Sequence, residues 1–239
     1  MYKNLSLVYD RLMDVDYETY RNLIDGILKD KSDLTLLDLG CGSGALTAKL
    51  GSYGQVFAID KSEEMLALAT AKYSKASYFA LDLLNINSLN QKFDFVLSAF
   101  DVFNYLENFE EFTKGLKEVY NSLNDGGIFV FDMHTPAKIN YMLEEEVFAY
   151  EEEDLAYIWY TYPTDNELEV ESELSFYVEE KDGLYKKMYE YQKQRTYSID
   201  KVIKSISSTG FTLERYFCDF DESNKDYENA HRIIFVLSK

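Results

Sequence analysis

Cysteine and histidine are both scarce in this sequence, with two residues of each. Cys41 lies in a glycine-rich turn, where a disulfide would obstruct close approach of the backbone, and Cys218 is far away along the chain. We therefore expect no disulfide framework, in agreement with a reducing compartment. His134 and His231 are distant from both cysteines and from each other, so the spacing of zinc ligands is missing and no metal is expected.

Long apolar segments and clusters of positive charge are missing as well. No stretch approaches the roughly 18 uninterrupted apolar residues of a membrane helix, and the start of the chain has no apolar segment behind a positive one. We therefore expect a cytoplasmic protein without a membrane partner. The formal net charge of −19, from 24 Lys and Arg against 43 Asp and Glu, would repel a polyanion and disfavours nucleic acid as substrate or partner.

The length of 239 residues suits one α/β domain with an insertion, since single cores stop growing at about 250 to 300 residues. Apolar residues at three- and four-residue intervals predict an amphipathic helix at 16–30. Short apolar runs then alternate with helical segments, and one of these helical segments is at 108–123. The apolar runs predict buried strands at 34–40, 55–60, 76–82, 93–100 and 127–134. The alternation predicts right-handed βαβ units and a parallel sheet covered on both faces.

The pattern changes after Pro136. Residues 137–154 form an acidic helical or loop segment, and the alternation at 155–197 switches to period two, which predicts an antiparallel β-meander of about three strands. Its Tyr157, Trp159, Tyr160 and Tyr162 are expected to give a mainly aromatic face. The meander could cover a pocket, contribute to a substrate wall or form a homodimer contact.

The core pattern resumes at Ser198, with a predicted helix that ends at Gly210. Strands at 211–220 and 231–238 predict a closing hairpin whose last strand runs antiparallel to the rest. The fold class is therefore α/β, a doubly wound, mostly parallel seven-stranded sheet with an inserted antiparallel β-meander. Residues 1–136 and 198–239 are predicted to form the core, and 137–197 the insertion.

A glycine-rich turn follows the first predicted strand and precedes a helix. Glycines there let the backbone pass close to a ligand at positive φ, while the helix presents unpaired N–H groups. Gly40, Gly42 and Gly44 make the pattern GxGxG. A dinucleotide site has GxGxxG, and Ala45 stands where its third glycine would fall.

Acids end the next two predicted strands. Asp60, twenty residues beyond Gly40, is placed to accept hydrogen bonds from ribose hydroxyls; the alternative is a helix-capping acid. Asp82, with the adjacent N–H of Leu83, could pair with an adenine edge; the alternative is a simple turn aspartate. Both lie on the sheet edge where open α/β sheets bind ligands.

Together these segments resemble the class I (Rossmann-like) S-adenosylmethionine-dependent methyltransferases, in particular small bacterial proteins with a methyltransferase domain. The matching motifs are LLDLGCGSG, AID, ALD, FDFVLSAFDVFNYL and LNDGGIFVFD, in chain order within residues 34–134. The opening LSLVYDRLM is similar to the start of small bacterial members, in which a tyrosine segment folds over the cofactor.

The resemblance implies that the cofactor is S-adenosyl-L-methionine and assigns residues to it. Asp38 and the glycines would surround the methionine moiety, Asp60 the ribose, and Asp82 the adenine. The full implied cofactor-binding set is Tyr9, Asp38, Gly40, Gly42, Gly44, Asp60, Lys61, Met65, Asp82, Leu83, Ser98 and Ala99.

Methyl transfer makes modest demands on the protein. A sulfonium methyl is already activated, so transfer needs an in-line acceptor about 3 Å away and, for some acceptors, a route for a proton. Candidate catalytic residues are Asp101 and Tyr105 after the fourth strand and His134 after the fifth, with Asn104 beside them. For His134, a loop histidine that never touches substrate is an equal alternative to a base.

The sequence therefore predicts a methyltransferase acting on nitrogen or oxygen of a small molecule. Methylation of RNA or protein of the translation machinery is an alternative. A nicotinamide-dependent oxidoreductase shares the turn and the ribose acid but is disfavoured by the missing third glycine, and a noncatalytic cofactor-binding protein is a further class. The acceptor cannot be read from these motifs, because function depends on the substrate half of the site.

Overall fold

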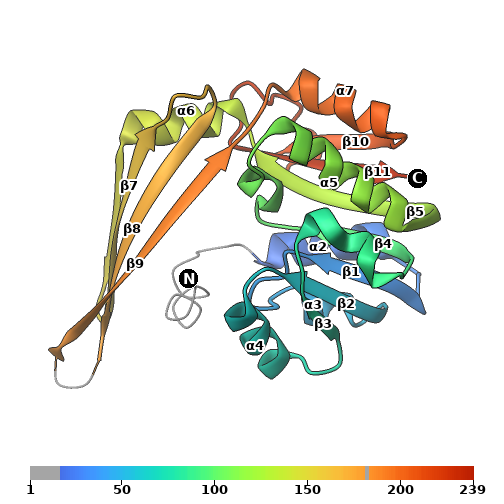
Figure 1. Ribbon diagram of the computed structural model, residues 1–239, viewed down its shortest axis with the longest axis horizontal. Coiled ribbons are helices and arrows are strands. Elements are labelled where there is room, and N and C mark those ends of the chain that lie inside the picture. Colours follow the sequence, from blue (N-terminus) through green and yellow to red (C-terminus); the bar gives the residue numbers. More distant parts are fainter. Residues whose placement is uncertain (1–16, 181–182) are drawn as a thin grey trace.

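A seven-stranded sheet forms the larger part of the structure, a computed structural model that describes residues 17–180 and 183–239. Its strand order is β10-β11-β5-β4-β1-β2-β3 (Figure 1). The strands are β1 (Leu34–Leu39), β2 (Gly54–Asp60), β3 (Ser77–Ala80), β4 (Phe93–Ser98), β5 (Leu123–His134), β10 (Thr212–Cys218) and β11 (Arg232–Ser238). Strands β1 to β5 pair in parallel, and β11 runs antiparallel to its neighbours β5 and β10. The predicted sheet and its antiparallel last strand are confirmed.

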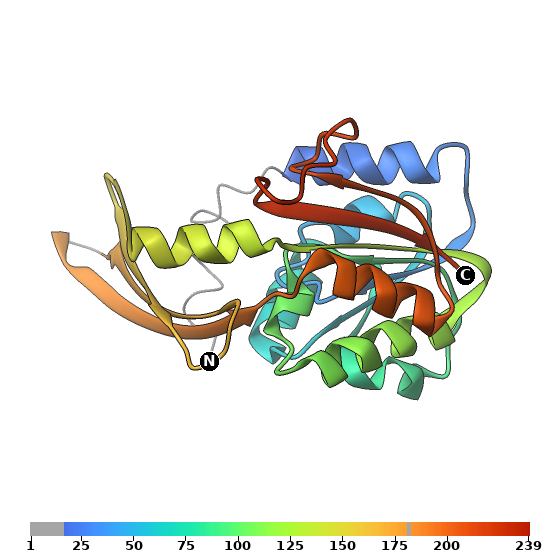
Figure 2. The same cartoon turned by 90° about the horizontal axis from the view of Figure 1, so that it is seen from above.

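Helices cover both faces of this sheet. They are α2 (Tyr17–Leu28), α3 (Thr47–Leu50), α4 (Glu63–Lys72), α5 (Phe109–Ser122), α7 (Ile199–Thr209) and the 3₁₀ helices η1 (Leu83–Leu89) and η2 (Val102–Tyr105). Figure 2 shows α2 on one face and α5 and α7 on the other. Within the described chain, no helix combines the length and the apolar character needed to cross a membrane.

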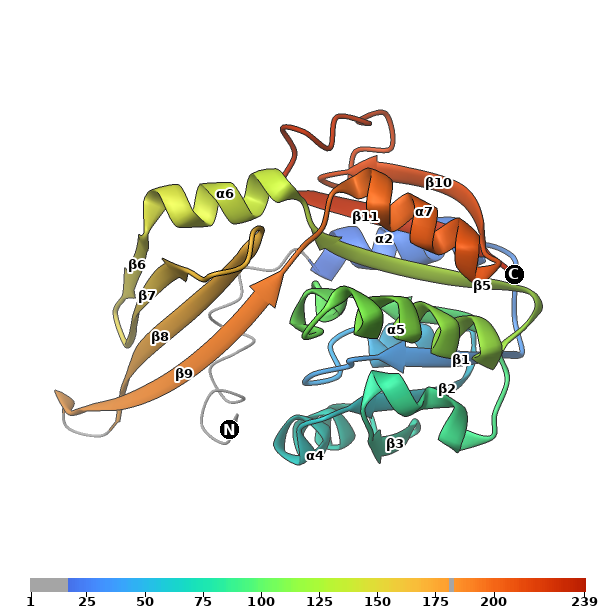
Figure 3. The same ribbon diagram turned by 45° about the horizontal axis from the view of Figure 1, so that its top comes forward.

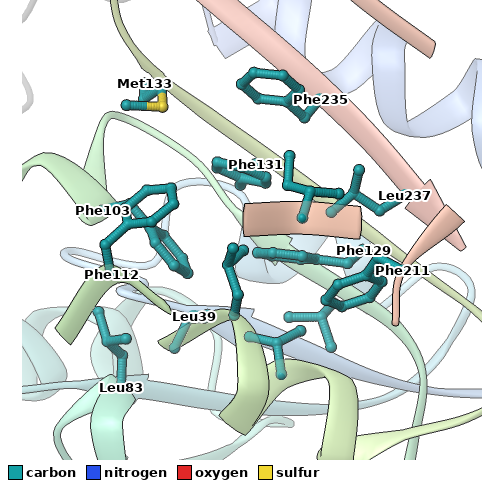
Figure 4. Packing of buried hydrophobic residues seen from close by; sticks show 14 of the residues in the cluster. Leu39, Leu83, Phe103, Phe112, Phe129, Phe131, Met133, Phe211, Phe235 and Leu237 are labelled. Carbon is teal, nitrogen blue, oxygen red and sulfur yellow. The ribbon is translucent and has the colours of Figure 1, made fainter. Parts of the chain in front are cut away.

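The core consists of two apolar layers, because successive side chains of a strand point to opposite faces. Phe129, Phe131 and Met133 of β5 pack in the cluster that contains α5 and α7 (Figure 4), whereas Val130 packs in the cluster that contains α2. A strand buried on both faces reads as a continuous apolar run, which is why the sequence revealed β5 and its neighbours. Asp132 shares the face of Val130, and its carboxylate is therefore buried on the α2 side.

Local signals fix several helix ends. The Ser62 hydroxyl accepts from the Met65 N–H at the start of α4, and Gly210 ends α7 at a φ of +109°, as predicted. Ser198 precedes α7 but its side chain makes no capping hydrogen bond.

One predicted strand boundary is wrong. The helix predicted at 108–123 and the strand predicted at 127–134 leave residues 124–126 as a turn, but β5 starts at Leu123, directly after α5. The reason is pairing at both sides of the segment. Leu123 pairs with Phe93, and the Gly126 N–H donates to the Lys239 carbonyl. These bonds draw the turn residues into the sheet.

A second, four-stranded antiparallel sheet follows β5, with the order β6-β7-β8-β9. Its elements are α6 (Pro136–Glu145), β6 (Val147–Glu152), β7 (Leu155–Pro163), β8 (Glu169–Glu179) and β9 (Tyr185–Arg195). Three strands were expected; β6 is the fourth, and it lies in the segment at 137–154 that was expected to be an acidic helix or loop. Figure 3 shows this sheet beyond the carboxyl end of β5, where the parallel strands of the first sheet also end.

The predicted single aromatic face of the second sheet is wrong. Tyr157 and Trp159 occupy alternate positions of β7, whereas Tyr160 and Tyr162 occupy the positions between them and therefore point to the opposite face. Trp159 packs with α6 through Ile139 and Met142, so the face that carries Tyr157 and Trp159 is the inner one. We call it the inner face below.

Candidate functional site

A cavity of about 240 Å³ lies at the carboxyl ends of the parallel strands, on the ligand-binding edge of such sheets. Tyr17 of α2 and Gln192 of β9 complete its wall. The residues singled out in the sequence that line it are Asp38, Gly40, Gly42, Asp60, Lys61, Met65, Leu83, Ala99 and Tyr105. Gly44, Asp82, Ser98, Asp101 and His134 do not line it, and Tyr9 lies outside the described residues.

Two glycines of the turn are required by packing. At Gly40, φ is +73° and a Cβ atom would lie 2.5 Å from a methyl carbon of Val102. At Gly44, φ is +78° and a Cβ atom would lie 2.8 Å from the Cβ atom of Ala69. Gly44 therefore lets α4 pack against the turn, although it does not itself border the cavity.

Gly42 differs, because it borders the cavity and a Cβ atom there would meet no atom of the described residues within 4 Å. Its φ of +52° limits the strain of alanine to about 1–2 kcal/mol. We expect Gly42→Ala to fold but to bind S-adenosylmethionine at least tenfold more weakly, because the added methyl narrows the backbone's approach to the ligand. Isothermal titration calorimetry and urea unfolding measure the two effects.

Gly126 provides the matched control for this variant. It has a φ of +78° and equally open surroundings, but it lies in β5 outside the cavity lining. Gly126→Ala should lose similar stability and no cofactor affinity. Equal affinity losses in the two variants would contradict a role for Gly42 beyond its backbone conformation.

Asp60 links the glycine turn to β2. Its Oδ2 atom accepts from the Gly42 N–H at 2.8 Å and its Oδ1 atom from the Ser62 N–H at 2.9 Å. Burial raises the pKa of Asp60, although these N–H groups stabilise its ionised form. A carboxylate has about four acceptor positions, so the two bonds leave capacity for a pair of ligand hydroxyls.

Asp38 is buried at the end of β1, where its Oδ2 atom accepts from the Thr47 hydroxyl at 2.6 Å. Burial raises the pKa of Asp38 to about 7, and the nearby Asp60 charge adds to the effect. Without a cationic ligand the folded chain therefore keeps a proton on Asp38 at pH values below about 7. An ammonium group in the cavity would favour the ionised form.

The Asp38 pKa predicts a pH dependence of stability. Between about pH 4 and pH 7 the folded chain holds a proton on Asp38 that the unfolded chain releases, so the free energy of unfolding falls as pH rises. Asp38→Asn keeps an oxygen for the Thr47 hydroxyl and should remove up to about 1.4 kcal/mol per pH unit of that slope. Urea unfolding at several pH values from about 5 to 8 tests this; identical slopes would contradict it.

The two residues predicted to bind adenine, Asp82 and Leu83, have different positions relative to the cavity. Leu83 lines the cavity, but the Asp82 side chain caps η1 by accepting from the Leu84 N–H and forms an ion pair with Lys61 at 2.7 Å. Partial burial tends to raise the pKa of Asp82, but Lys61 and the Leu84 N–H hold it below its ordinary value. Ala99 lines the cavity, whereas the Ser98 hydroxyl is buried and has no hydrogen-bond partner within residues 17–180 and 183–239.

A strained turn follows β4 at the cavity. Phe100 and Asp101 have φ values of +66° and +54°, a left-handed conformation that is unfavourable for both residues. Asp132 of β5 holds the turn by accepting from the Phe100 N–H at 2.7 Å and the Asp101 N–H at 3.0 Å. Since Phe100 lines the cavity, Asp132 helps to shape the cavity wall from behind.

Asp101 and Asp132 share one guanidinium. Arg232 of β11 donates to Asp132 and, at 3.0 Å, to Asp101. Gln194 donates to the other oxygen of Asp101 at 2.7 Å, so β9 of the second sheet is tied to the same cluster. We call Asp101, Asp132 and Arg232 the buried ion cluster.

His134 borders the buried ion cluster, with its Nε2 atom 3.5 Å from an Asp101 oxygen. Its Nδ1 atom has no hydrogen-bond partner in the described part of the chain. Burial lowers the pKa of His134 to about 4, so the imidazole is neutral near pH 7. Asn104 is fully buried and joins three segments, accepting from the His134 N–H and donating to the Arg195 carbonyl. The catalytic roles of Asp101, His134 and Tyr105 stay predictions.

Several residues of the site were missed by sequence reasoning. Asp132 carried a signal, an acid inside an otherwise apolar strand. Arg232 carried none, because only the register of β11 on β5 brings it to Asp132. Gln192 and Gln194 belong to the period-two segment, whose position relative to the cavity depends on tertiary structure.

The lining fits S-adenosylmethionine. The glycine turn brings backbone close to the cavity, Asp60 keeps acceptor capacity for ribose hydroxyls, and Asp38 offers a buried acid for an amino group. Met65, Leu83 and Ala99 give the apolar surface that an adenosine requires.

Similarity to known proteins agrees with this fit. The model of the methyltransferase domain family matches residues 36–127. A relative from Geobacillus sp. (strain WCH70) is 31% identical over 100% of this chain and 99% of its own. YqeM of Bacillus subtilis (strain 168) is 31% identical over 100% of this chain and 97% of its own. Both relatives are named as methyltransferases, and neither name gives an acceptor.

A solved structure extends the similarity to the whole fold. The crystal structure of an S-adenosylmethionine-dependent methyltransferase from Clostridium acetobutylicum ATCC 824 has a TM-score of 0.89 and 27% identity, covering 99% of this chain and 98% of that one. Similarity over the whole length argues against the alternative of a nicotinamide-dependent oxidoreductase. The chain belongs to the class I S-adenosylmethionine-dependent methyltransferases, and its cofactor is S-adenosylmethionine.

Proposed function

We propose that the chain methylates a nitrogen or oxygen atom of a small molecule. The observation that carries the proposal is a contact in the cavity wall, where the Tyr105 hydroxyl donates to the Gln192 side chain at 3.2 Å. Because Gln192 belongs to β9, the second sheet borders the cavity and limits the space left for an acceptor. The net charge of −19 also favours a small molecule over nucleic acid.

The cofactor-binding roles form part of this proposal. Asp60 binds the ribose, Asp38 the amino group, and Leu83 borders the adenine. Lys61 orients Asp82 through their ion pair. Asp82 does not line the cavity, so in this proposal it supports the adenine-binding residues from outside the lining. When bound, the cofactor supplies a methyl group already activated by its positive sulfur.

The acceptor side needs position more than acid–base strength. Tyr105 is the candidate catalytic residue that lines the cavity. Asp101 and His134 act in this proposal as positioning residues, since they support the Phe100 turn and the η2 helix. A neutral histidine with a pKa of about 4 is a weak proton acceptor at neutral pH, which supports this assignment.

Residues 137–197 act in this proposal as an inserted acceptor unit on the core formed by 1–136 and 198–239. Hydrogen bonds from Asn104 to Arg195 and from Thr196 to His134 fasten the end of the insertion to the site. We place the protein in the cytoplasm, where a reducing environment keeps its two free cysteines as thiols.

A labelled methyl-transfer screen tests the proposal. The full chain is incubated with methyl-labelled S-adenosylmethionine and separately with metabolite, RNA and protein fractions, and Asp60→Ala serves as the control that should lose cofactor binding. Label in a small molecule supports the proposal. Label confined to RNA or protein would contradict the proposal and show that the methyl acceptor is a macromolecule.

A further inference from the structure

The inner face of the second sheet buries polar atoms that have no hydrogen-bond partner among the residues that the structure describes. They are the Nε1 atom of Trp159, the Oγ atom of Ser172 and the Oε2 atom of Glu190. The side chains of Ser172 and Glu190 are 0% and 3% exposed. Buried polar groups in native proteins are almost always hydrogen-bonded, so three exceptions in one sheet require an explanation.

The strand register places these three atoms on one face. Trp159 pairs with Leu174, which pairs with Glu190 on the other side; Ser172 pairs with Gln192 one row further along. Directly paired residues of neighbouring strands point to the same face. Trp159 and Glu190 are therefore two strand spacings apart, roughly 10 Å, with Leu174 between them.

This group is connected to the cofactor cavity by hydrogen bonds through Gln192, although Trp159, Ser172 and Glu190 do not themselves line the cavity. Gln192, which lines the cavity, donates from its amide nitrogen to the Oε1 atom of Glu190 and accepts from the Tyr105 hydroxyl. One oxygen of Glu190 is thus held by the cavity wall, and the other is unpaired. Among the residues that the structure describes, the strand neighbours of Glu190 on this face are uncharged: Leu174, Met188 and Gln192.

The unpaired atoms define the chemistry of a partner. A carboxylate oxygen only accepts, and its strongest partner is a protonated amine. The Trp159 N–H only donates and requires an acceptor oxygen or nitrogen. Trp159 and Phe148, with ring centroids 5.1 Å apart, and the pair Tyr157 and Phe176 offer aromatic surface beside these polar groups.

We propose that the inner face is the acceptor subsite and takes a small molecule whose protonated amine binds Glu190 and whose hydrogen-bond acceptor binds Trp159. The inference rests on the proposed function, because it assigns the binding site for the methyl acceptor. Burial raises the pKa of Glu190 to about 7, and a cationic partner would return this carboxyl to its ionised form.

Trp159 is the one tryptophan of the chain, so its fluorescence reports on this face directly. The full chain, saturated with S-adenosylhomocysteine, is titrated with phenethylamine and 2-phenylethanol, and with cyclohexylamine and cyclohexanol. Each pair shares a carbon skeleton and differs in the amine. We expect at least one amine to change the fluorescence saturably and to bind at least tenfold more tightly than its alcohol.

Glu190→Gln should weaken amine binding at least tenfold and leave the alcohols unchanged. Glu173→Gln is the matched control, because Glu173 pairs with Tyr191 and therefore lies on the opposite face of β8. Equal losses in the two variants, or amines that bind no better than their alcohols, would overturn the subsite.

Calorimetry with S-adenosylhomocysteine tests the acceptor subsite and the proposed function separately. Unchanged affinity in Glu190→Gln shows that the variant is folded and that the subsite is distinct from the cofactor site. If the parent bound S-adenosylhomocysteine but no amine, the subsite would be rejected and the proposed function retained. If the parent bound neither, both would be rejected.

Discussion

Replacing Asp60 with alanine lowers the affinity for S-adenosylmethionine by a factor of about 10² to 10⁴. Hydrogen bonds to charged groups contribute about 1.5–3 kcal/mol each, and the Asp60 carboxylate has capacity for two of them to a ribose. Loss of two such bonds gives the stated range. The substitution also removes the acceptor of the Gly42 N–H, which loosens the glycine turn. Isothermal titration calorimetry with parent and variant measures the change.

Asp94 gives the matched control for Asp60. It also binds a backbone N–H, that of Thr35, and a side chain, that of Asn124, but it lies at the start of β4, on the opposite edge of the sheet. Asp94→Ala should reduce stability and leave cofactor affinity unchanged. Parent-like affinity of Asp60→Ala would show that the ribose assignment is wrong.

Replacing Arg232 with methionine lowers the free energy of unfolding by about 3–5 kcal/mol, the usual effect of removing one partner from a buried ion pair. Arg232 is the cation between Asp101 and Asp132, whose side chains are 11% and 1% exposed. Without it, two buried carboxylates face each other, and Asp132 no longer holds the left-handed Phe100–Asp101 turn in the same way. Urea unfolding at neutral pH measures the loss.

Arg215 is the control for Arg232, since it lies on the neighbouring strand β10 and pairs with Glu222 at 3.5 Å with both side chains exposed. Arg215→Met should change the free energy of unfolding by less than about 1 kcal/mol. If the two arginine variants lost equal stability, the buried ion cluster would not hold the end of β4 as described here.

Much of the cofactor half could be predicted because its signals are local. A strand buried on both faces is a continuous apolar run, and a glycine at positive φ or a terminal acid follows it within a few residues. Gly40, Gly42, Asp38 and Asp60 were found in this way, and the structure brings them to one cavity. Asp82 shows the limit of that reasoning, since its ion pair with Lys61 depends on side-chain positions that spacing does not fix.

The acceptor half could not be predicted to the same degree, because its contacts join distant segments. Arg232 reaches Asp132 across 100 residues of sequence, and Gln194 reaches Asp101 across 93. The period of β7 distinguishes its two faces, but only the packing of α6 decides which face is inner. Strand β6 gave no period because its residues are mostly exposed on both faces.

Titration of the purified full chain with S-adenosylhomocysteine, and in parallel with a nicotinamide dinucleotide, tests the central claim most directly. The structure predicts saturable binding of one S-adenosylhomocysteine per chain and no heat change with the dinucleotide. A chain that bound the dinucleotide and ignored S-adenosylhomocysteine would contradict the assignment of the glycine turn, Asp38 and Asp60 to a sulfonium nucleoside.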